Sequence, residues 1–237
     1  MLEKKYFIGS NDVDFNLDLK LSSLFKIMQD IAVEHAEKLG VGKKKTMDVG
    51  LNWVISRIKV EIYKTPKYQQ TITVRTHPGK TIKFVFPRYF EIIDENDEVL
   101  IRASSTWLVI ESASRKLSLN PFPNFELPGE EYETQITQPE KVGLFDSTLV
   151  ENRKVRFSDT DLNGHMNNTR YIDFITDIHD SAFYKNKRIS KIIINYNKEL
   201  KDNQTVSLYS SHSNPEFIKG EVEGNNIFTV EISYEDR

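Results

Sequence analysis

The chain has 237 residues, of which 38% are hydrophobic and 28% are charged, with a formal net charge of −3 at pH 7. This composition is typical of a folded globular protein, because disordered chains are poor in apolar and aromatic residues. The absence of cysteine excludes disulfides, thiolate metal sites and a cysteine nucleophile. The slightly acidic charge balance argues against nucleic acid as a partner.

The sequence also indicates a compartment. No apolar run approaches the roughly 18 residues that a membrane span needs, and Met1–Phe7 is not followed by the long apolar segment of a secretory signal. The lack of cysteine fits a reducing environment. We therefore expect a cytoplasmic protein with no membrane span.

The first half of the chain predicts one helix followed by strands. Apolar residues recur at steps of three and four over residues 19–39, which is the spacing of a helix. Ser22 or Ser23 is expected to cap its start, and Gly40 its end. Alternating β-branched residues then predict strands of an antiparallel sheet, at residues 51–63, 69–76, 83–93 and 98–111.

The second half repeats this order. Four prolines between residues 121 and 139 predict a linker over 121–148, which divides the chain into units at 1–120 and 149–237. A helix is expected at 167–185, with the apolar residues Tyr171, Ile172, Phe174, Ile175, Ile178 and Phe183 on one face. Strands are expected at 189–197, 203–210, 216–223 and 226–234. At an offset of 134, residues 69–74 align with 203–208, and Ile58 and Val60 align with Ile192 and Ile194. The sequence therefore predicts a duplicated α+β unit.

The segment between Arg156 and Tyr171 is rich in Asp and Asn and holds one His. Asp161, Asn163 and His165 alternate, so in an extended segment their side chains share one side. Asn167 or Asn168 is expected to cap the following helix, whose free N–H groups would face the same region and stabilise an oxyanion. Turn and cap chemistry alone also accounts for this composition. The corresponding segment of the first half, residues 13–23, has no His, so the second copy carries something extra.

At these residues the chain resembles the acyl-acyl carrier protein thioesterases. The match runs over Ser158–Ile172, in the pattern Ser-Asp-x-Asp-x-Asn-x-His followed by an apolar residue and Asn-Asn, and returns at Tyr196–Glu199. Weaker matches at 52–57, 61–66 and 102–107 extend it over almost the whole chain. The resemblance implies an α+β fold of two tandem hot-dog units, each with a long helix wrapped by an antiparallel sheet.

The family's catalytic positions fall on Asp161, Asn163, His165 and Glu199. The cysteine that follows this Glu in the family is Leu200 here, so no mechanism can use it as a nucleophile. The implied reaction is hydrolysis of a fatty acyl thioester on acyl carrier protein. Glu199 and His165 would activate water, while Asp161 either holds the geometry or attacks directly. No cofactor or metal is implied.

Three alternatives and three further features belong with this interpretation. One alternative is an acyl-CoA thioesterase, in which coenzyme A replaces acyl carrier protein as the carrier. Another is a non-catalytic acyl-thioester binding protein. Hot-dog hydratases with Asp five positions before His are excluded, because Thr160 stands there. The apolar first unit is the expected acyl-binding half, and a homodimer is left open. Candidate surfaces for the acidic carrier are two basic clusters, Lys43–Lys45 and Lys185, Lys187, Arg188 and Lys191.

Overall fold

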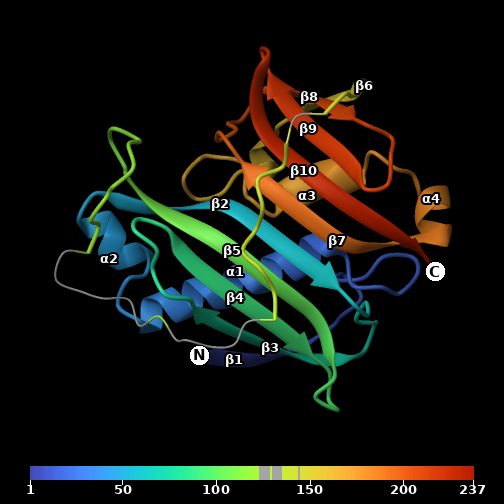
Figure 1. Cartoon of the computed structure of the whole chain (residues 1–237), viewed down its shortest axis with the longest axis horizontal. Coiled ribbons are helices and arrows are strands. Elements are labelled where there is room, and N and C mark those ends of the chain that lie inside the picture. The colour runs from blue at the N-terminus through green and yellow to red at the C-terminus, as the bar shows by residue number, and fades with distance from the viewer. Residues whose placement is uncertain (123–128, 130–134, 144) are drawn as a thin grey trace. The chain divides into compact units, whose positions relative to one another are not determined.

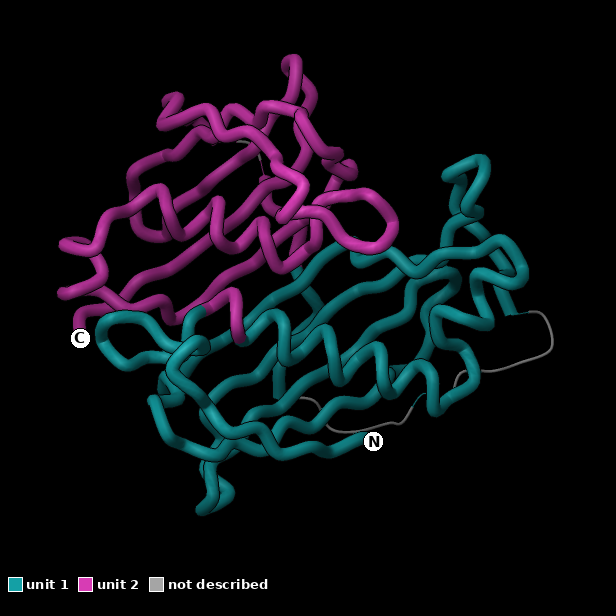
Figure 2. The backbone as a smooth tube through the Cα atoms, turned by 180° about the vertical axis from the view of Figure 1, so that it is seen from behind, with its two compact units in different colours: residues 1–20, 24–139 teal, residues 21–23, 140–237 magenta. Residues whose placement is uncertain are grey.

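The computed structural model describes residues 1–122, 129, 135–143 and 145–237. The rest of the predicted linker, at 123–128, 130–134 and 144, lies outside the described residues. Internal contacts divide the chain into two compact units (Figure 2). Unit 1 comprises residues 1–20 and 24–139, and unit 2 comprises residues 21–23 and 140–237.

Unit 1 is an antiparallel sheet with one long helix. Its described strands run in the order β1-β3-β4-β5-β2, and Figure 1 shows α1 lying behind them. The elements are β1 (Leu2–Phe7), α1 (Leu21–Lys38), α2 (Lys43–Asp48), β2 (Leu51–Ile62), β3 (Thr71–Pro78), β4 (Phe86–Ile93) and β5 (Val99–Glu111). The helix and the four strands that the sequence predicts here are all confirmed.

Helix α1 buries its apolar stripe, with Leu24, Met28 and Ile31 each at most 2% exposed. Gly40 ends it as predicted: its φ of 74° is a left-handed conformation, and its N–H donates to the Glu37 carbonyl. The predicted serine cap is wrong. The helix begins at Leu21 with Lys20 as its N-cap residue, so both serines lie inside the first turn, and no side chain caps the helix.

Unit 2 repeats the same strand order with shorter helices. Its described strands run β6-β8-β9-β10-β7, which matches β1-β3-β4-β5-β2 element for element. The elements are β6 (Thr148–Lys154), a 3₁₀ turn at Phe157–Asp159, α3 (Arg170–Thr176), α4 (Ser181–Asn186), β7 (Lys187–Tyr196), β8 (Thr205–Ser210), β9 (Glu216–Val222) and β10 (Asn225–Asp236). The shared order confirms the predicted duplication.

The single helix predicted at 167–185 is wrong. Two short helices, α3 and α4, stand in its place. The chain breaks between them because the side chain of Asp180 accepts a hydrogen bond from the Phe183 N–H and so starts a new helix. Upstream of this break, the Thr176 hydroxyl donates back to the Ile172 carbonyl inside the last turn of α3. In the described part of unit 2, two short helices therefore stand where the resemblance implies one long helix.

The sequence also missed β1, β6 and α2. Strands β1 and β6 are outer strands with mostly exposed side chains, so they show little of the hydrophobic alternation that marks a half-buried strand. Helix α2 has only six residues and one buried side chain. Among the described residues, no helix combines the length and apolar character needed to cross a membrane.

Candidate active site

Asp161, Asn163 and His165 lie on a tight turn, not on the extended segment that the sequence predicted. Thr160 and Met166 pair across the turn, and the Asp161 N–H donates to the His165 carbonyl at 2.7 Å. Gly164 closes the turn with a φ of 74°, a left-handed conformation that glycine adopts without strain. A segment that reverses within seven residues cannot keep the alternation of a strand.

The carboxylate of Asp161 holds this turn together. Its Oδ1 accepts the backbone N–H of Asn163 at 2.8 Å and that of His165 at 3.3 Å. Its Oδ2 accepts the side-chain amide of Asn163, with Nδ2 at 3.2 Å. Each oxygen of Asp161 is therefore hydrogen-bonded within the turn.

Glu199 reaches the turn from the loop that follows β7. Its Oε2 lies 3.5 Å from Nε2 of His165, and the two side chains are 39% and 21% exposed. The Met166 N–H donates to the Leu200 carbonyl at 2.8 Å, and His165 pairs with Lys201 across the same contact. The structure thus brings together all four residues that the resemblance implies, although Glu199 is distant from the others in sequence.

A buried tyrosine supports this loop. Tyr171 in α3 is 2% exposed, and its hydroxyl is hydrogen-bonded to the backbone of Leu200. Burial raises the pKa of Tyr171 above its ordinary value, with the nearby carboxylates of Glu199 and Asp161 adding to the rise. The contact between the Tyr171 hydroxyl and the Leu200 backbone opposes this rise in pKa and lies next to Glu199 in the chain.

A second carboxylate fixes the start of the segment. Asp159 is 6% exposed, and its Oδ1 accepts from Nε and a terminal nitrogen of Arg170 at 3.2 and 3.1 Å. Its Oδ2 accepts the Arg156 N–H at 2.9 Å. The guanidinium of Arg170 thus compensates the negative charge of Asp159, which would be costly to bury alone.

The predicted N-cap residues of the following helix are wrong. Thr169 is the N-cap residue of α3. Asn167 instead accepts hydrogen bonds from the N–H and the hydroxyl of Thr169, both at 3.0 Å, in a turn just before the helix. The oxyanion role expected for the α3 N–H groups stays a prediction.

Unit 1 contains the same turn, with the same hydrogen bonds from the backbone N–H groups. Val13 pairs with Leu19, and Oδ1 of Asp14 accepts the N–H of Asn16 at 2.8 Å and of Asp18 at 3.1 Å. The Asp14 N–H donates to the Asp18 carbonyl at 2.9 Å. Asp14, Asn16 and Asp18 thus occupy the positions of Asp161, Asn163 and His165.

The two turns differ in the side chain at the position of the histidine. In unit 1 this residue is Asp18, which is 3% exposed and forms an ion pair with Lys67. Thr65 stands two residues before Lys67, as Glu199 stands two residues before Lys201. Unit 1 therefore keeps the scaffold of the site and lacks both members of the histidine–glutamate pair.

One of the two predicted basic clusters is largely neutralised by acidic side chains of β10. Lys187 pairs with Asp236 at 2.7 Å, Arg188 with Glu235 at 2.6 Å, and Lys191 with Glu231 at 2.9 Å. This cluster is a poor docking surface for an acidic partner, because the charges already have counter-charges. Docking at Lys43–Lys45 on α2 stays a prediction.

Unit 2 holds a second polar cluster that the sequence did not predict. Glu216 is 1% exposed, and it accepts hydrogen bonds from His179 at 2.7 Å, from the Tyr234 hydroxyl at 3.0 Å and from Ser210. Ser210 donates to the Glu216 carboxylate and not to the His179 imidazole. Ser210, His179 and Glu216 therefore do not form a nucleophilic triad.

Opposing effects act on the ionisation of Glu216. Burial disfavours the charged form, but the hydrogen bonds from His179, Ser210 and Tyr234 outweigh burial and hold the pKa of this carboxyl below its ordinary value.

Over the described part of the chain, no three His, Asp or Glu side chains are grouped as metal ligands.

Comparison with protein families covers both units. The family model described as the acyl-ACP thioesterase N-terminal domain matches residues 1–120, and the model described as the C-terminal domain matches residues 145–235. Among curated proteins, an oleoyl-acyl carrier protein thioesterase from Arabidopsis thaliana is 22% identical over 244 residues, covering 94% of this chain and 66% of the relative. The chain spans between half and two thirds of the length of the curated relatives it matches.

Solved structures show the same fold. An acyl-ACP thioesterase from Bacteroides thetaiotaomicron superposes with a TM-score of 0.90 at 24% identity, covering 98% of this chain and 97% of the other. The 12:0-ACP thioesterase from Umbellularia californica superposes with a TM-score of 0.85 at 18% identity, covering 100% and 97%. The expected fold of two hot-dog units is thereby confirmed.

Proposed function

The chain belongs to the acyl-ACP thioesterase family, and we propose that it hydrolyses the thioester of fatty acids carried on acyl carrier protein. The observation that carries this proposal is the pairing of His165 with Glu199, at 3.5 Å, beside the turn held by Asp161. A carboxylate next to an imidazole is the equipment that general acid–base hydrolysis needs. A protein that only bound acyl thioesters would not require this pair.

In the proposed mechanism, Glu199 and His165 remove a proton from water as it adds to the thioester carbonyl. The resulting tetrahedral intermediate carries its negative charge on the former carbonyl oxygen. When it collapses, the carbon–sulfur bond breaks and the protonated His165 returns the proton to the leaving thiolate. The products are a free fatty acid and the thiol of the carrier. General acid–base assistance of this kind contributes about 10²- to 10⁴-fold to rate.

We assign Asp161 a positioning role in place of direct attack. Both of its oxygens accept hydrogen bonds within the turn. Its counterpart Asp14 makes the same two backbone hydrogen bonds in a turn that has no histidine. A carboxylate that builds the turn in both units is better explained by structure than by nucleophilic chemistry. Asn163, held by Asp161, would orient the carbonyl or the water.

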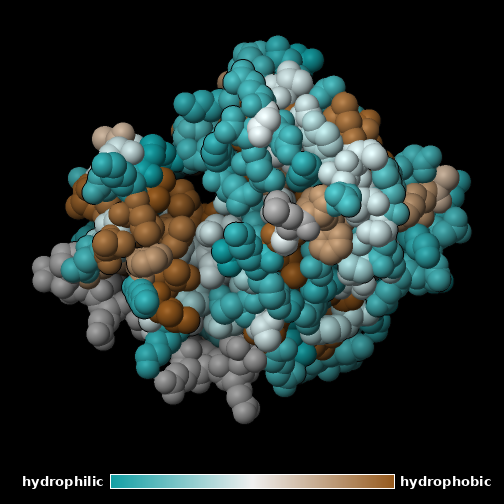
Figure 3. Space-filling view, turned by 45° about the horizontal axis from the view of Figure 1, so that its top comes forward, coloured by the Kyte–Doolittle hydropathy of each residue, from teal (hydrophilic) through white to brown (hydrophobic). Residues whose placement is uncertain are grey.

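We propose that unit 1 binds the acyl chain. Among the apolar residues of this unit, Leu24, Met28 and Ile31 are fully buried core. Trp53, Ile55, Phe84 and Phe86 are only half-buried, and Trp53 contacts the rings of Phe86 and Phe122 at 5.0 and 5.6 Å. Hydrophobic side chains gather at the end of unit 1 that carries α2 (Figure 3). This accessible apolar surface supports the proposed division of labour, in which unit 2 holds the catalytic residues.

The carrier, compartment and assembly are further parts of the proposal. We propose acyl carrier protein rather than coenzyme A as the carrier, and the cytoplasm as the compartment. The curated relatives are named as chloroplastic proteins, so cell fractionation with an antibody to the chain is the appropriate check. Light scattering on the purified protein would distinguish a monomer from the homodimer that the sequence leaves open.

The experiment that tests the function is release of free thiol from acyl carrier protein loaded with fatty acids of graded length. Matched acyl-CoA substrates and the variant His165→Ala are assayed in parallel. Turnover of the carrier-bound substrates that falls at least 100-fold in the variant supports the proposal. Turnover restricted to acyl-CoA would make the chain an acyl-CoA thioesterase. Binding of both substrates without turnover would make it a binding protein.

A further inference from the structure

Lys201 lies beside the candidate active site. It pairs with His165 across the contact between the turn and the loop after β7, and paired residues of this kind have Cβ atoms about 5 Å apart. Leu200, between Glu199 and Lys201, is 0% exposed, whereas its two neighbours are exposed. Because alternate residues of an extended segment face the same way, the side chains of Glu199 and Lys201 share the side that faces away from the core.

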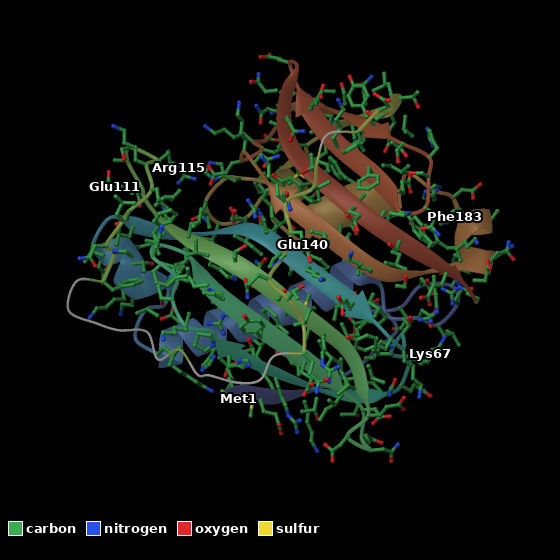
Figure 4. All side chains as sticks on the ribbon, viewed as in Figure 1. Met1, Lys67, Glu111, Arg115, Glu140 and Phe183 are labelled. Atoms are coloured by element: carbon green, nitrogen blue, oxygen red, sulfur yellow. The ribbon has the colours of Figure 1, made fainter. Side chains whose placement is uncertain are left out.

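Unit 1 shows where a lysine at this position places its ammonium group. Lys67, labelled in Figure 4, lies in the loop between β2 and β3 and pairs with Asp18 across the equivalent contact. The residue before it, Pro66, is buried as Leu200 is. The Nζ of Lys67 forms an ion pair with the carboxylate of Asp18. A lysine at this register therefore reaches the side chain that stands in the place of the histidine.

In unit 2 this lysine has no such counter-charge in the part of the chain that the structure describes. His165 stands where unit 1 has Asp18, and within the described residues no carboxylate lies within 4 Å of the Lys201 ammonium. Glu199, which is the acidic side chain on the same side, is paired with His165. Among the residues that the structure describes, the ammonium group of Lys201 therefore has no carboxylate partner, and its backbone pairing with His165 leaves it close enough to meet a negative charge on a bound substrate.

We propose that Lys201 is a further catalytic residue, whose ammonium stabilises the negative charge that forms on the thioester oxygen when water adds. The inference rests on the proposed hydrolase function. The lysine keeps its proton throughout: the charge appears on the oxygen as the carbonyl double bond opens, and it disappears when the double bond reforms and the thiolate leaves. Preorganised positive groups aimed at a developing oxyanion are among the largest contributors to enzymatic rate.

The test compares steady-state kinetics of Lys201→Gln and Lys201→Arg with the wild type, using an acyl carrier protein substrate and an acyl-pantetheine thioester of the same chain length. We expect kcat of Lys201→Gln to fall on the order of 10- to 100-fold with both substrates, with KM changed less than threefold. Lys201→Arg retains the charge and should recover most of the loss. The matched control is Lys198→Gln, an exposed neighbour whose ammonium binds Asn225, and its kcat should stay within twofold of wild type.

Three outcomes would overturn the assignment. A loss confined to the carrier-bound substrate and expressed in KM would identify Lys201 as a docking residue. An equal loss in Lys201→Gln and Lys201→Arg would show that the charge is not what matters. An unchanged kcat in Lys201→Gln, with an active wild type and an inactive His165→Ala, would refute this inference and leave the hydrolase function standing. An inactive wild type would instead refute the proposed function.

Discussion

Gly220 lies directly opposite Phe228 across strands β9 and β10, and the phenyl ring occupies the space where a side chain at position 220 would stand. Phe228 is fully buried and packs edge-on against Tyr171, with ring centroids 5.3 Å apart. Tyr171 in turn holds the loop of Glu199 through the Leu200 backbone. A glycine in a strand thus supports a series of packed side chains that ends beside the His165–Glu199 pair.

We predict that Gly220→Ala destabilises the protein by about 1–3 kcal/mol, the usual cost of forcing extra volume into a packed core. The free energy of unfolding from urea titration measures this change. Gly143→Ala is the matched control, because a Cβ at position 143 meets no atom of the described residues within 4 Å. Equal stability of the two variants would mean that the ring of Phe228 moves aside at no cost.

Glu216 gives a prediction for pH dependence. Because its folded-state pKa lies below the ordinary value of 4.5, its stabilising contribution is complete above that value and is lost as the pH falls through the lower folded-state pKa. We expect Glu216→Gln to lower the free energy of unfolding by about 1–3 kcal/mol at pH 7. The difference from wild type should shrink as the pH is lowered below 4.5.

Urea titrations of both proteins between pH 3 and 7 measure this difference. Glu235→Gln is the control, because Glu235 pairs with Arg188 at the surface and is 53% exposed. Surface pairs contribute about 0–1 kcal/mol. A difference between Glu216→Gln and wild type that stays constant over the whole pH range would contradict the role given to the carboxylate charge.

The ion pair of unit 1 should matter for stability and not for catalysis. Lys67→Met leaves the carboxylate of Asp18, which is 4% exposed, without its ammonium partner. Because Lys67 is itself 57% exposed, we expect a modest loss of about 1–2 kcal/mol in the free energy of unfolding. Lys4→Met breaks the exposed pair with Glu34 and should change the stability less than Lys67→Met does, because solvent screens exposed pairs.

Kinetics on the folded proteins complete this comparison. We expect kcat of Lys67→Met to stay within twofold of wild type. In unit 1 the positions equivalent to His165 and Glu199 hold Asp18 and Thr65, so this unit has no histidine–glutamate pair. A large fall in kcat with unchanged stability would place the turn of unit 1 in the catalytic machinery.

Substitutions at Glu199 and Asp161 separate the two proposed mechanisms. Glu199→Gln removes the base and should lower kcat by about 10²- to 10⁴-fold. Asp161→Asn keeps an oxygen able to accept the N–H groups of Asn163 and His165, so we expect a smaller fall. The ordering of the two rates, measured by thiol release, is the readout. If Asp161→Asn is the more damaging change, direct attack by Asp161 and a mixed anhydride become the better mechanism.

Much of the fold could be predicted from periodicity. The spacing of Leu24, Met28 and Ile31 marks α1, because a long helix buries a continuous stripe. The break before Ser181 could not be predicted in the same way, since apolar residues continue through it. It depends on a local competition in which Asp180 caps a new helix. Outer strands such as β1 bury too little to leave a pattern.

The sequence predicted which residues form the candidate site, but not how the chain arranges them. The residues Asp161, Asn163, His165 and Glu199 follow from the resemblance, but the first three lie on a turn that is defined by a left-handed residue at Gly164 and by backbone hydrogen bonds. The copy of this turn in unit 1 could not be recognised from the sequence either. The strands repeat at an offset of 134, whereas Asp14 and Asp161 are 147 residues apart, so an ungapped alignment cannot match both.

The repeated turn has a consequence for binding stoichiometry. In an assembly of two identical chains, every substitution is made twice, and both copies of a site change together. Here the two copies belong to one chain, and Asp18 and His165 differ at the same position. The covalent duplication allows the two copies to diverge, so that Asp18 forms an ion pair while His165 is free to take the catalytic role that we propose for it. A tight transition-state analogue should accordingly titrate to one molecule per chain, and calorimetry on the purified protein would count it directly.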